Sequence, residues 1–359
     1  MSDEMSMENK EMMNETVKVD TSAFVEAGKT AYSSMGWKMA LYALIGTGMQ
    51  FAYMFLVPVM FGADVVNRPW YSWMLIAIPL YAIAFPILLL LIKNTPKSTI
   101  EKHSMKFGKF ICCIFMSAAI CGVGGMIGTL INLLVVTPFG VASDNSNVLA
   151  NLMLDSQPFF RILTVGILAP VVEELIFRKL LIDRVVKYGE FVAILTSGLM
   201  FGLFHGNFSQ AIFAMGLGMF FSFIYIRTGK VGYPILLHMI INLSTSVITV
   251  FLTQRLDLEA ITKMSAMDPT SAEAQALVFQ VLPSLLSYAG WLIFLFICVI
   301  VGIIMWCCFA KRMFIKPQEC QMPQKGRCKA AYLNAGMILY FVFCIALFVF
   351  TYASMIAAA

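Results

Sequence analysis

The chain has 359 residues, of which 60% are apolar, 13% are aromatic and only 13% are charged. A soluble domain carries about 25% charged residues, so this composition leaves too little polar surface to cover a water-soluble fold. The net charge of +5 does not indicate a nucleic-acid partner, because the basic residues stand at the ends of apolar segments.

The first 30 residues are polar and lean acidic, and they contain no apolar run of the kind found in a cleavable signal peptide. We expect residues 1–37 to form a polar cytoplasmic tail, disordered or loosely helical at its start. The first membrane helix would then double as the targeting signal.

Nine apolar segments follow the tail. They are too long, and alternate too little, for the ~10-residue strands of a membrane barrel. Runs of roughly 20 apolar residues match the length at which an α-helix crosses about 30 Å of hydrocarbon. The predicted fold is therefore all-α, a polytopic membrane bundle of about nine transmembrane helices. The segments are 38–62, 70–92, 109–136, 159–185, 190–206, 209–227, 231–253, 283–309 and 332–352.

Lysine and arginine are concentrated in every second connection between these segments. Residues 93–109 carry five of them and residues 310–331 carry six. Residues 137–158 carry none, and residues 254–282 have two basic residues against four acidic ones. The positive-inside rule then predicts a cytoplasmic N-terminus and a C-terminus outside.

A pair of carboxylates inside the fourth segment is the first functional signal. A charged group at bilayer depth costs at least ~2.5–3.5 kcal/mol on insertion scales, so its presence usually marks a working site. Glu174 and Arg178 are four residues apart on one helix face and are predicted to pair, which could also be a purely structural clamp. Glu173 points about 100° away from Glu174. It is the better candidate to accept a proton from water.

Two of the three histidines lie in membrane segments. His238 and Asn242 are four residues apart and face the same way, while His205 ends the short fifth segment. A lone membrane histidine often only bonds neighbouring helices, but two histidines, two glutamates and an asparagine on separate helices favour a site. We expect these groups to meet Glu173 at mid-depth. His238 lies nearer the basic end of its segment, which suggests access from the cytoplasmic side, and His103 in a basic loop is expected to be ordinary.

Together these motifs resemble the CPBP family of CAAX prenyl endopeptidases and Abi-like bacteriocin-processing or immunity proteins. The family pattern is a diglutamate followed by an aromatic residue and arginine, then Phe-x-x-x-His, then His-x-x-x-Asn. The resemblance covers about residues 155–250. It predicts a four-helix, CPBP-like catalytic core over 155–253, with three helices before it in 38–136 and two after it in 283–359. The matching residues are Glu173, Glu174, Phe177, Arg178, Phe201, His205, His238 and Asn242.

The resemblance implies an intramembrane endopeptidase in a bacterial cell membrane. Its substrate would be a membrane-associated peptide or protein, either prenylated or similar to a bacteriocin or pheromone. Glu173 would activate water and His205 would relay the proton. His238 and Asn242 would support a water or metal and stabilise the oxyanion. The predicted catalytic set is Glu173, Glu174, His205, His238 and Asn242, supported by Arg178, Phe177 and Phe201.

The cofactor stays open at this point. Glu173, His205 and His238 are adequate ligands for a divalent metal such as zinc. A metal-free glutamate mechanism is equally compatible with the family. The chain has no HExxH motif, and the candidate ligands come from separate helices.

Two other functions also place polar groups in a membrane. A proton-coupled transporter would use buried Glu and His on Gly-broken helices, but no inverted repeat is visible and the polar residues concentrate in one block of four helices. A non-catalytic immunity or scaffold protein would bind a partner helix. The intact motif set argues against a dead site but leaves a binding role open.

Overall fold

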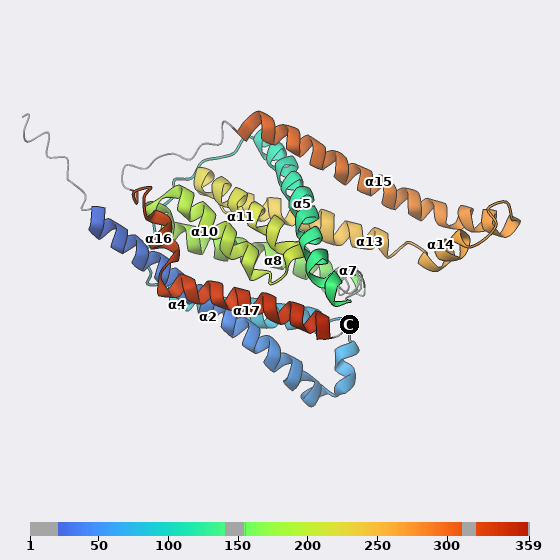
Figure 1. Ribbon diagram of the computed structural model, residues 1–359, viewed down its shortest axis with the longest axis horizontal. Helices are drawn as coiled ribbons and strands as arrows, with labels where there is room; N and C mark the ends of the chain where they lie inside the picture. The colour runs from blue at the N-terminus through green and yellow to red at the C-terminus, as the bar shows by residue number, and fades with distance from the viewer. Residues whose placement is uncertain (1–20, 141–153, 155, 311–320, 358–359) are drawn as a thin grey trace, which may run out of the picture.

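The computed structural model describes residues 21–140, 154, 156–310 and 321–357. Over these ranges the chain is helical and contains no strand, which confirms the all-α prediction. The start of the predicted tail, most of the 137–158 connection and the first half of the last basic loop lie outside the described residues. Most helices run roughly along the long axis of the molecule, while α5 crosses them at a steep angle (Figure 1).

Seven helical spans are long and apolar enough to cross a membrane. Two further segments complete the set: a helical run over 158–188, and α10, which is apolar but short. The prediction of a polytopic protein with about nine segments is therefore confirmed. The spans are α2 (Thr21–Phe61), α3 to α4 (Tyr71–Ile76, η2 Ala77–Ala84, Phe85–Ile92), α5 (Phe107–Val136), α11 (Phe208–Thr228), α12 to α13 (Gly232–Asn242, η8 Leu243–Ile248, Thr249–Thr253), α15 (Ala272–Phe309) and α17 (Ala335–Ala357).

The run over 158–188 consists of six pieces joined without a break. The pieces are α7 (Pro158–Arg161), η5 (Ile162–Leu168), α8 (Ala169–Glu174), η6 (Leu175–Leu180), α9 (Leu181–Val185) and η7 (Val186–Tyr188). Helix α10 follows at Glu190–Phe204.

Short helices also stand in the connections. They are η1 (Ala63–Asn67), η3 (Thr137–Phe139), α14 (Leu258–Ser265) and α16 (Arg327–Tyr332).

Two helices begin earlier than the apolar segments indicate. Helix α2 begins at Thr21 because its first turns are amphipathic, and Tyr32 and Met35 on one face are fully buried. Helix α15 begins at Ala272, where the Ser271 hydroxyl accepts the backbone N–H of Ala274 as an N-cap. An average of hydrophobicity along the sequence detects neither the buried face at the start of α2 nor the N-cap of α15.

Small residues bring the central helices close together, and Gly124 with Gly128 and Gly198 with Gly202 have the GxxxG spacing that permits this. A Cβ added to Gly202 of α10 would lie 2.6 Å from the Ala211 carbonyl oxygen of α11. A Cβ added to Gly128 of α5 would overlap the Phe208 carbonyl oxygen. Helix α11 is therefore held between α10 and α5, with no room for larger side chains at these crossings.

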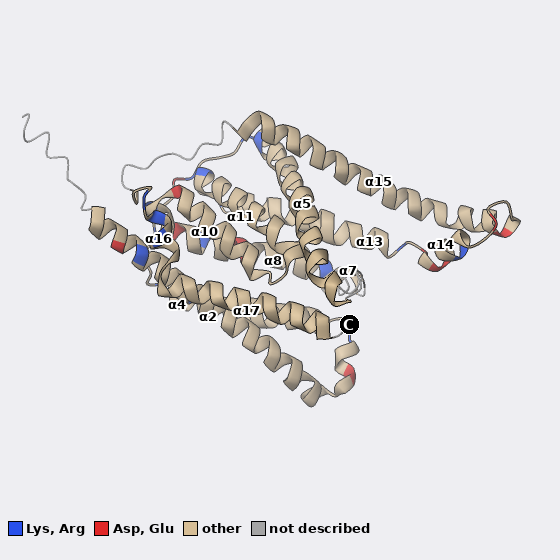
Figure 2. Cartoon of the chain, in the orientation of Figure 1, with Lys and Arg blue, Asp and Glu red and all other residues tan. Residues whose placement is uncertain are grey.

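The charged side chains divide the bundle into two ends (Figure 2). Lys and Arg gather at the end that holds the connections 93–106, 187–189, 228–231 and 321–326, which we call the basic end. The opposite end, which holds the connections at 62–70, 205–207 and 254–271, is called the far end. The alternation of basic connections in the sequence thus corresponds to one physical end of the bundle.

The α2–α17 crossing allows a test of the fold. A Cβ on Gly36 would lie 2.5 Å from the Met337 backbone nitrogen, closer than packed atoms approach. We expect Gly36→Ala to lower the free energy of unfolding by about 1–3 kcal/mol through overpacking. Thermal melting of the detergent-solubilised protein measures this. Gly48 on the same helix has nothing within 4 Å of an added Cβ. Gly48→Ala should therefore be neutral or slightly stabilising, and equal melting temperatures for the two variants would contradict the crossing.

Candidate active site

The two glutamates lie in α8, in the middle of the helical run over 158–188. This helix is flanked by η5 and η6, both of which are π-helical. The wider turns of a π-helix rotate the following side chains and occur often at functional sites. Segments η2 and η8, described below, are π-helical as well. Local backbone irregularity thus concentrates around one region of an otherwise regular bundle.

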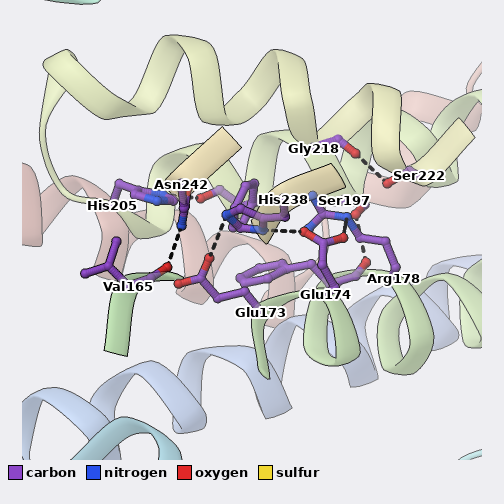
Figure 3. Close-up of polar contacts among 12 residues, drawn as sticks. Val165, Glu173, Glu174, Arg178, Ser197, His205, Gly218, Ser222, His238 and Asn242 are labelled. Atoms are coloured by element: carbon purple, nitrogen blue, oxygen red, sulfur yellow. Dashed lines mark hydrogen bonds and ion pairs between the residues drawn. The ribbon is translucent and has the colours of Figure 1, made fainter. Parts of the chain in front are cut away.

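Glu174 is fully buried and fully engaged (Figure 3). One carboxylate oxygen lies 2.8 Å from Nε of Arg178, so the predicted ion pair is confirmed. The other oxygen lies 2.8 Å from Nδ1 of His238. Glu174 does not line the cavity described below. Its two contacts hold Arg178 and the ring of His238 in place, and the catalytic role in the predicted set stays a prediction.

Arg178 is also fully buried and lies beneath two aromatic rings. Its guanidinium carbon is 4.5 Å from the centre of the Phe201 ring and 5.7 Å from that of Phe221. Such contacts stabilise a desolvated cation. Its two Nη atoms form no hydrogen bond with the described residues. The charge of Arg178 is therefore balanced mainly by Glu174 and the ring faces.

His238 stands between the two carboxylates (Figure 3). Its Nδ1 is bonded to Glu174, and its Nε2 lies 3.9 Å from the nearer oxygen of Glu173. Because a carboxylate only accepts hydrogen bonds, Nδ1 carries the proton in this contact. The rings of Phe201 and Phe221 pack against the imidazole at centroid distances of 5.8 and 6.0 Å. His238 is thereby fixed in both position and orientation.

Glu173 is the carboxylate that faces open space. Its side chain is 16% exposed, whereas that of Glu174 is 0% exposed. Glu173 lines the cavity, and it forms no hydrogen bond with any described residue. A buried carboxylate without bonded donors, next to an oriented histidine, is free to accept a proton from a bound water.

His205 is held by the turn between α10 and α11. Its Nδ1 lies 2.9 Å from the Phe201 carbonyl oxygen, so Nδ1–H donates and Nε2 is left as the acceptor. Gly206 adopts φ +66°, and Asn207 caps α11 by accepting the Gln210 N–H at 3.0 Å. The Asn207 amide also donates to the His205 carbonyl oxygen at 2.9 Å. The expected short fifth segment is thus present, and it ends at this turn.

The same turn is tied to the C-terminal helix. The backbone N–H of Phe208 donates to the Tyr352 hydroxyl oxygen of α17 at 2.9 Å. That hydroxyl in turn donates to the Asn132 side-chain oxygen of α5 at 2.5 Å. Tyr340 of α17 also donates to the Met200 carbonyl oxygen of α10 at 2.8 Å. Helix α17 therefore supports the backbone that presents His205.

Asn242 links α12 to the helix of the glutamates. Its amide nitrogen donates to the Val165 carbonyl oxygen of η5 at 2.9 Å. One amide hydrogen is occupied by this bond, which leaves the second for a ligand. Both Asn242 and Val165 line the cavity. Asn242 thus combines a structural bond with a place in the site.

A cavity of about 450 Å³ lies against these residues. Four of the five predicted catalytic residues line it, with Glu174 as the exception. Its walls also include side chains from the N-terminal helices. The lining residues are Gln50, Ile76, Leu80, Tyr81, Cys121, Gly125, Thr164, Val165, Ala169, Glu173, Phe201, Phe204, His205, Gln210, Phe213, Ala214, Leu217, His238, Ile241, Asn242, Thr245 and Ser246.

The cavity extends from the glutamate layer toward the far end of the bundle. Thr164 precedes Glu173 on its helix, and Ser246 follows His238 on its own, so both lie on the far side of the layer. The expectation of access from the basic end is therefore not met.

A polar network lies on the basic side of the same layer, with Asp183 buried and the Lys179 side chain 44% exposed. Asp183 accepts a hydrogen bond from the Tyr225 hydroxyl at 2.6 Å and pairs with Lys179 at 2.7 Å. Together with the buried Arg178, this network occupies the space between the glutamates and the basic end. It accounts for the direction of the cavity.

The candidate metal ligands do not assemble into a site of three. Among the described residues, no group of three or more His, Cys, Asp or Glu side chains is arranged to hold a metal ion. Glu173, His205 and His238 therefore do not fit the zinc site that the sequence allowed, and no step of the proposed mechanism uses a metal.

Several lining residues escaped the sequence analysis. Thr245 and Ser246 continue the face of His238 and Asn242 at helical spacing, so this signal was available. Tyr81 and Gln50 come from the N-terminal helices and carry no motif. Only the packing of those helices against the core places them at the site.

Comparisons with known proteins agree with this geometry. Residues 155–244 match the family described as Type II CAAX prenyl endopeptidase Rce1-like. The chain is 26% identical over 206 residues to "Putative membrane peptidase YdiL" of Bacillus subtilis (strain 168), which covers 54% of this chain and 82% of that protein. It is 33% identical over 94 residues to "Membrane-embedded CAAX protease MroQ" of Staphylococcus aureus (strain USA300), which covers 24% of this chain and 37% of that protein.

No solved structure matches the chain. The matched region contains the diglutamate helix, both histidines and Asn242, and it ends before the two C-terminal helices. Residues 155–244 of this integral membrane protein are therefore similar to the Rce1-like family of type II CAAX prenyl endopeptidases.

Proposed function

We propose that this protein is an intramembrane endopeptidase in which Glu173 activates the attacking water. The observation that carries the proposal is the environment of Glu173. This carboxylate lies inside an apolar bundle, faces a cavity, has no bonded donor among the described residues, and stands 3.9 Å from Nε2 of an oriented histidine. The similarity of residues 155–244 to the Rce1-like endopeptidase family favours peptide hydrolysis over transport or a scaffold role.

The reaction follows from these groups. Glu173 takes a proton from water as the water oxygen attacks the scissile carbonyl carbon, which leaves a tetrahedral oxyanion. His205, Asn242 and His238 line the space in which this oxyanion forms. The C–N bond then breaks, and the proton held by Glu173 passes to the leaving amine. The products are a carboxylic acid and an amine, and Glu173 is ready for the next water.

The cavity walls suggest how a peptide lies in the site. His238, Asn242, Thr245 and Ser246 form a polar stripe along one helix, while apolar residues such as Leu80 and Phe213 form other parts of the wall. A peptide without secondary structure needs partners for its N–H and C=O groups inside a membrane. The polar stripe supplies such partners on the far side of Glu173, and the apolar residues can receive side chains or a lipid group.

Reconstitution in liposomes tests the proposal. We expect cleavage of a fluorogenic farnesylated CAAX peptide, with the unprenylated peptide as a matched comparison for the lipid requirement. A separate arm of the experiment adds EDTA. Loss of activity with EDTA would require metal ligands other than the residues that the structure brings together at this site. If monodisperse protein cleaves neither peptide but carries protons across the liposome membrane, the transporter alternative is correct.

The orientation in the membrane is a second proposal. The basic end should face the cytoplasm and the far end the outside. In a variant depleted of other cysteines, native Cys328 reports on the basic end and Ser265→Cys on the far end, and both positions are exposed. An impermeant thiol reagent added to intact cells should label position 265 and spare 328. The reverse pattern would invert the topology.

A further inference from the structure

Tyr81 lies at the active site although it is far from the family motifs in the sequence. It belongs to η2, in the second membrane segment, outside the matched residues 155–244. Its side chain lines the same cavity as Glu173, His205 and Asn242. The N-terminal helices therefore contribute a functional group to the site, in addition to covering it.

The Tyr81 hydroxyl is available to a ligand. It forms no hydrogen bond with any described residue, in contrast to Tyr225, Tyr340 and Tyr352, whose hydroxyls are all engaged. The O–H donor of Tyr81, which has no partner among the described residues, thus belongs to a side chain that lines the same cavity as the general base.

Packing holds Tyr81 in this place. Segment η2 is π-helical and includes Pro79, and it packs on α2 at Gly46. A Cβ on Gly46 would lie 2.5 Å from Cδ2 of Leu80, so a larger residue there would force the Leu80 side chain to shift. One turn earlier on α2, the ring of Tyr42 stacks on Phe204 at a centroid distance of 5.6 Å. The residue next to Tyr81 is therefore fixed against α2, and α2 is fixed against the core.

The other polar groups of the site leave a need for a donor. Asn242 donates one of its two amide hydrogens to the Val165 carbonyl oxygen. His205 donates through Nδ1 to a backbone carbonyl, which leaves an acceptor on its other nitrogen. Arg178 does not line the cavity. Hydrolysis of a peptide bond places a full negative charge on the carbonyl oxygen, and one well-aimed donor there is worth about 10²–10³-fold in rate.

We propose that the Tyr81 hydroxyl donates a hydrogen bond to this oxyanion, as a catalytic residue supplied by the N-terminal helices. The inference rests on the proposed peptidase function. The hydrogen bond forms as the water oxygen bonds to the carbonyl carbon and is released when the C–N bond breaks. The phenol keeps its proton throughout, so the proton balance at Glu173 is unchanged.

The test compares Tyr81→Phe with the wild type on the farnesylated peptide. We expect kcat to fall by about 10²–10³-fold with little change in KM, because the donor acts on charge present only in the transition state. A peptide phosphonamidate, which mimics the tetrahedral oxyanion, should lose affinity by a similar factor. Tyr53→Phe is the matched control, since its hydroxyl is buried on α2 without a partner and its ring packs on Tyr71.

Each outcome has one meaning. Unchanged kcat in Tyr81→Phe, or an equal loss in Tyr53→Phe, would overturn the assignment. The assignment would also be overturned if kcat falls together with the melting temperature while the affinity for the phosphonamidate stays unchanged. Tyr81→Leu is a second variant that removes the same hydroxyl, in case the Phe variant does not fold. If the wild type cleaves neither peptide, the proposed function itself fails. If the wild type cleaves, Glu173→Gln does not, and Tyr81→Phe cleaves as fast as the wild type, only this inference fails.

Discussion

Glu173→Gln is expected to lower turnover by about 10²–10⁴-fold or more while the protein still folds. Glutamine keeps the size of the side chain and its hydrogen-bonding capacity, but it cannot accept the proton of the attacking water. Folding should survive because Glu173, unlike Glu174, has no bonded partner in the described residues that the change would break. The measurement is peptide cleavage by purified, monodisperse protein in liposomes.

The histidines should show graded effects. We expect His205→Ala and His238→Ala to be about as damaging as the glutamate change, and Asn242→Ala somewhat less so, since its bond to Val165 occupies one of its two amide hydrogens. His103→Ala is the control, because that side chain is 57% exposed and only meets Glu101 at the surface. Normal cleavage by Glu173→Gln would refute the glutamate mechanism. Equal losses of cleavage activity in the His103 and His205 variants would mean that the assay reports the stability of the protein and not its catalysis.

Arg178→Ala should destabilise the folded protein by on the order of 3–5 kcal/mol. The change leaves the fully buried Glu174 without its cation and removes the guanidinium from beneath Phe201 and Phe221. It should also lower activity, because Glu174 fixes the ring of His238 at 2.8 Å. The yield and melting temperature of detergent-purified protein measure the loss of stability.

A double variant separates charge from packing. Combining Arg178→Ala with Glu174→Gln removes the unpaired buried charge, while the glutamine oxygen can still accept the hydrogen of His238 Nδ1. We expect the double variant to fold better than Arg178→Ala alone, although the lost contacts with the rings will keep it below wild type. If the double variant is no better folded, the charge of Glu174 does not cause the destabilisation.

The sequence predicted the fold and the centre of the site for the same physical reason. Ionisable groups are so unfavourable in an apolar segment that Glu173, Glu174, Arg178 and the two histidines stand out without any structure. The pairing of Glu174 with Arg178 followed from helix periodicity alone. Periodicity within one helix could not predict the second bond of Glu174, which is formed with His238 on another helix. That bond is the contact through which Glu174 would orient His238.

The remaining features depend on contacts between distant segments. Tyr81 is an ordinary residue for a membrane helix, and only the packing of η2 on α2 brings it to the cavity. The direction of the cavity depends on Asp183, Lys179 and Tyr225, which fill the basic side of the glutamate layer. The position of His238 along its helix suggested the opposite direction, because position along one helix says nothing about which side its neighbours fill.

The bond between α17 and the His205 turn has a consequence for biogenesis. Tyr352 receives the backbone N–H of Phe208 although it is synthesised 144 residues later. While the ribosome is still making the intervening helices, the loop that presents His205 lacks this anchor, and Asn132 lacks the same hydroxyl. The histidine and glutamate helices can enter the membrane early, but the loop reaches its final geometry only after α17 is inserted. The nascent chain therefore passes its own translocation machinery with the loop that carries His205 still unanchored.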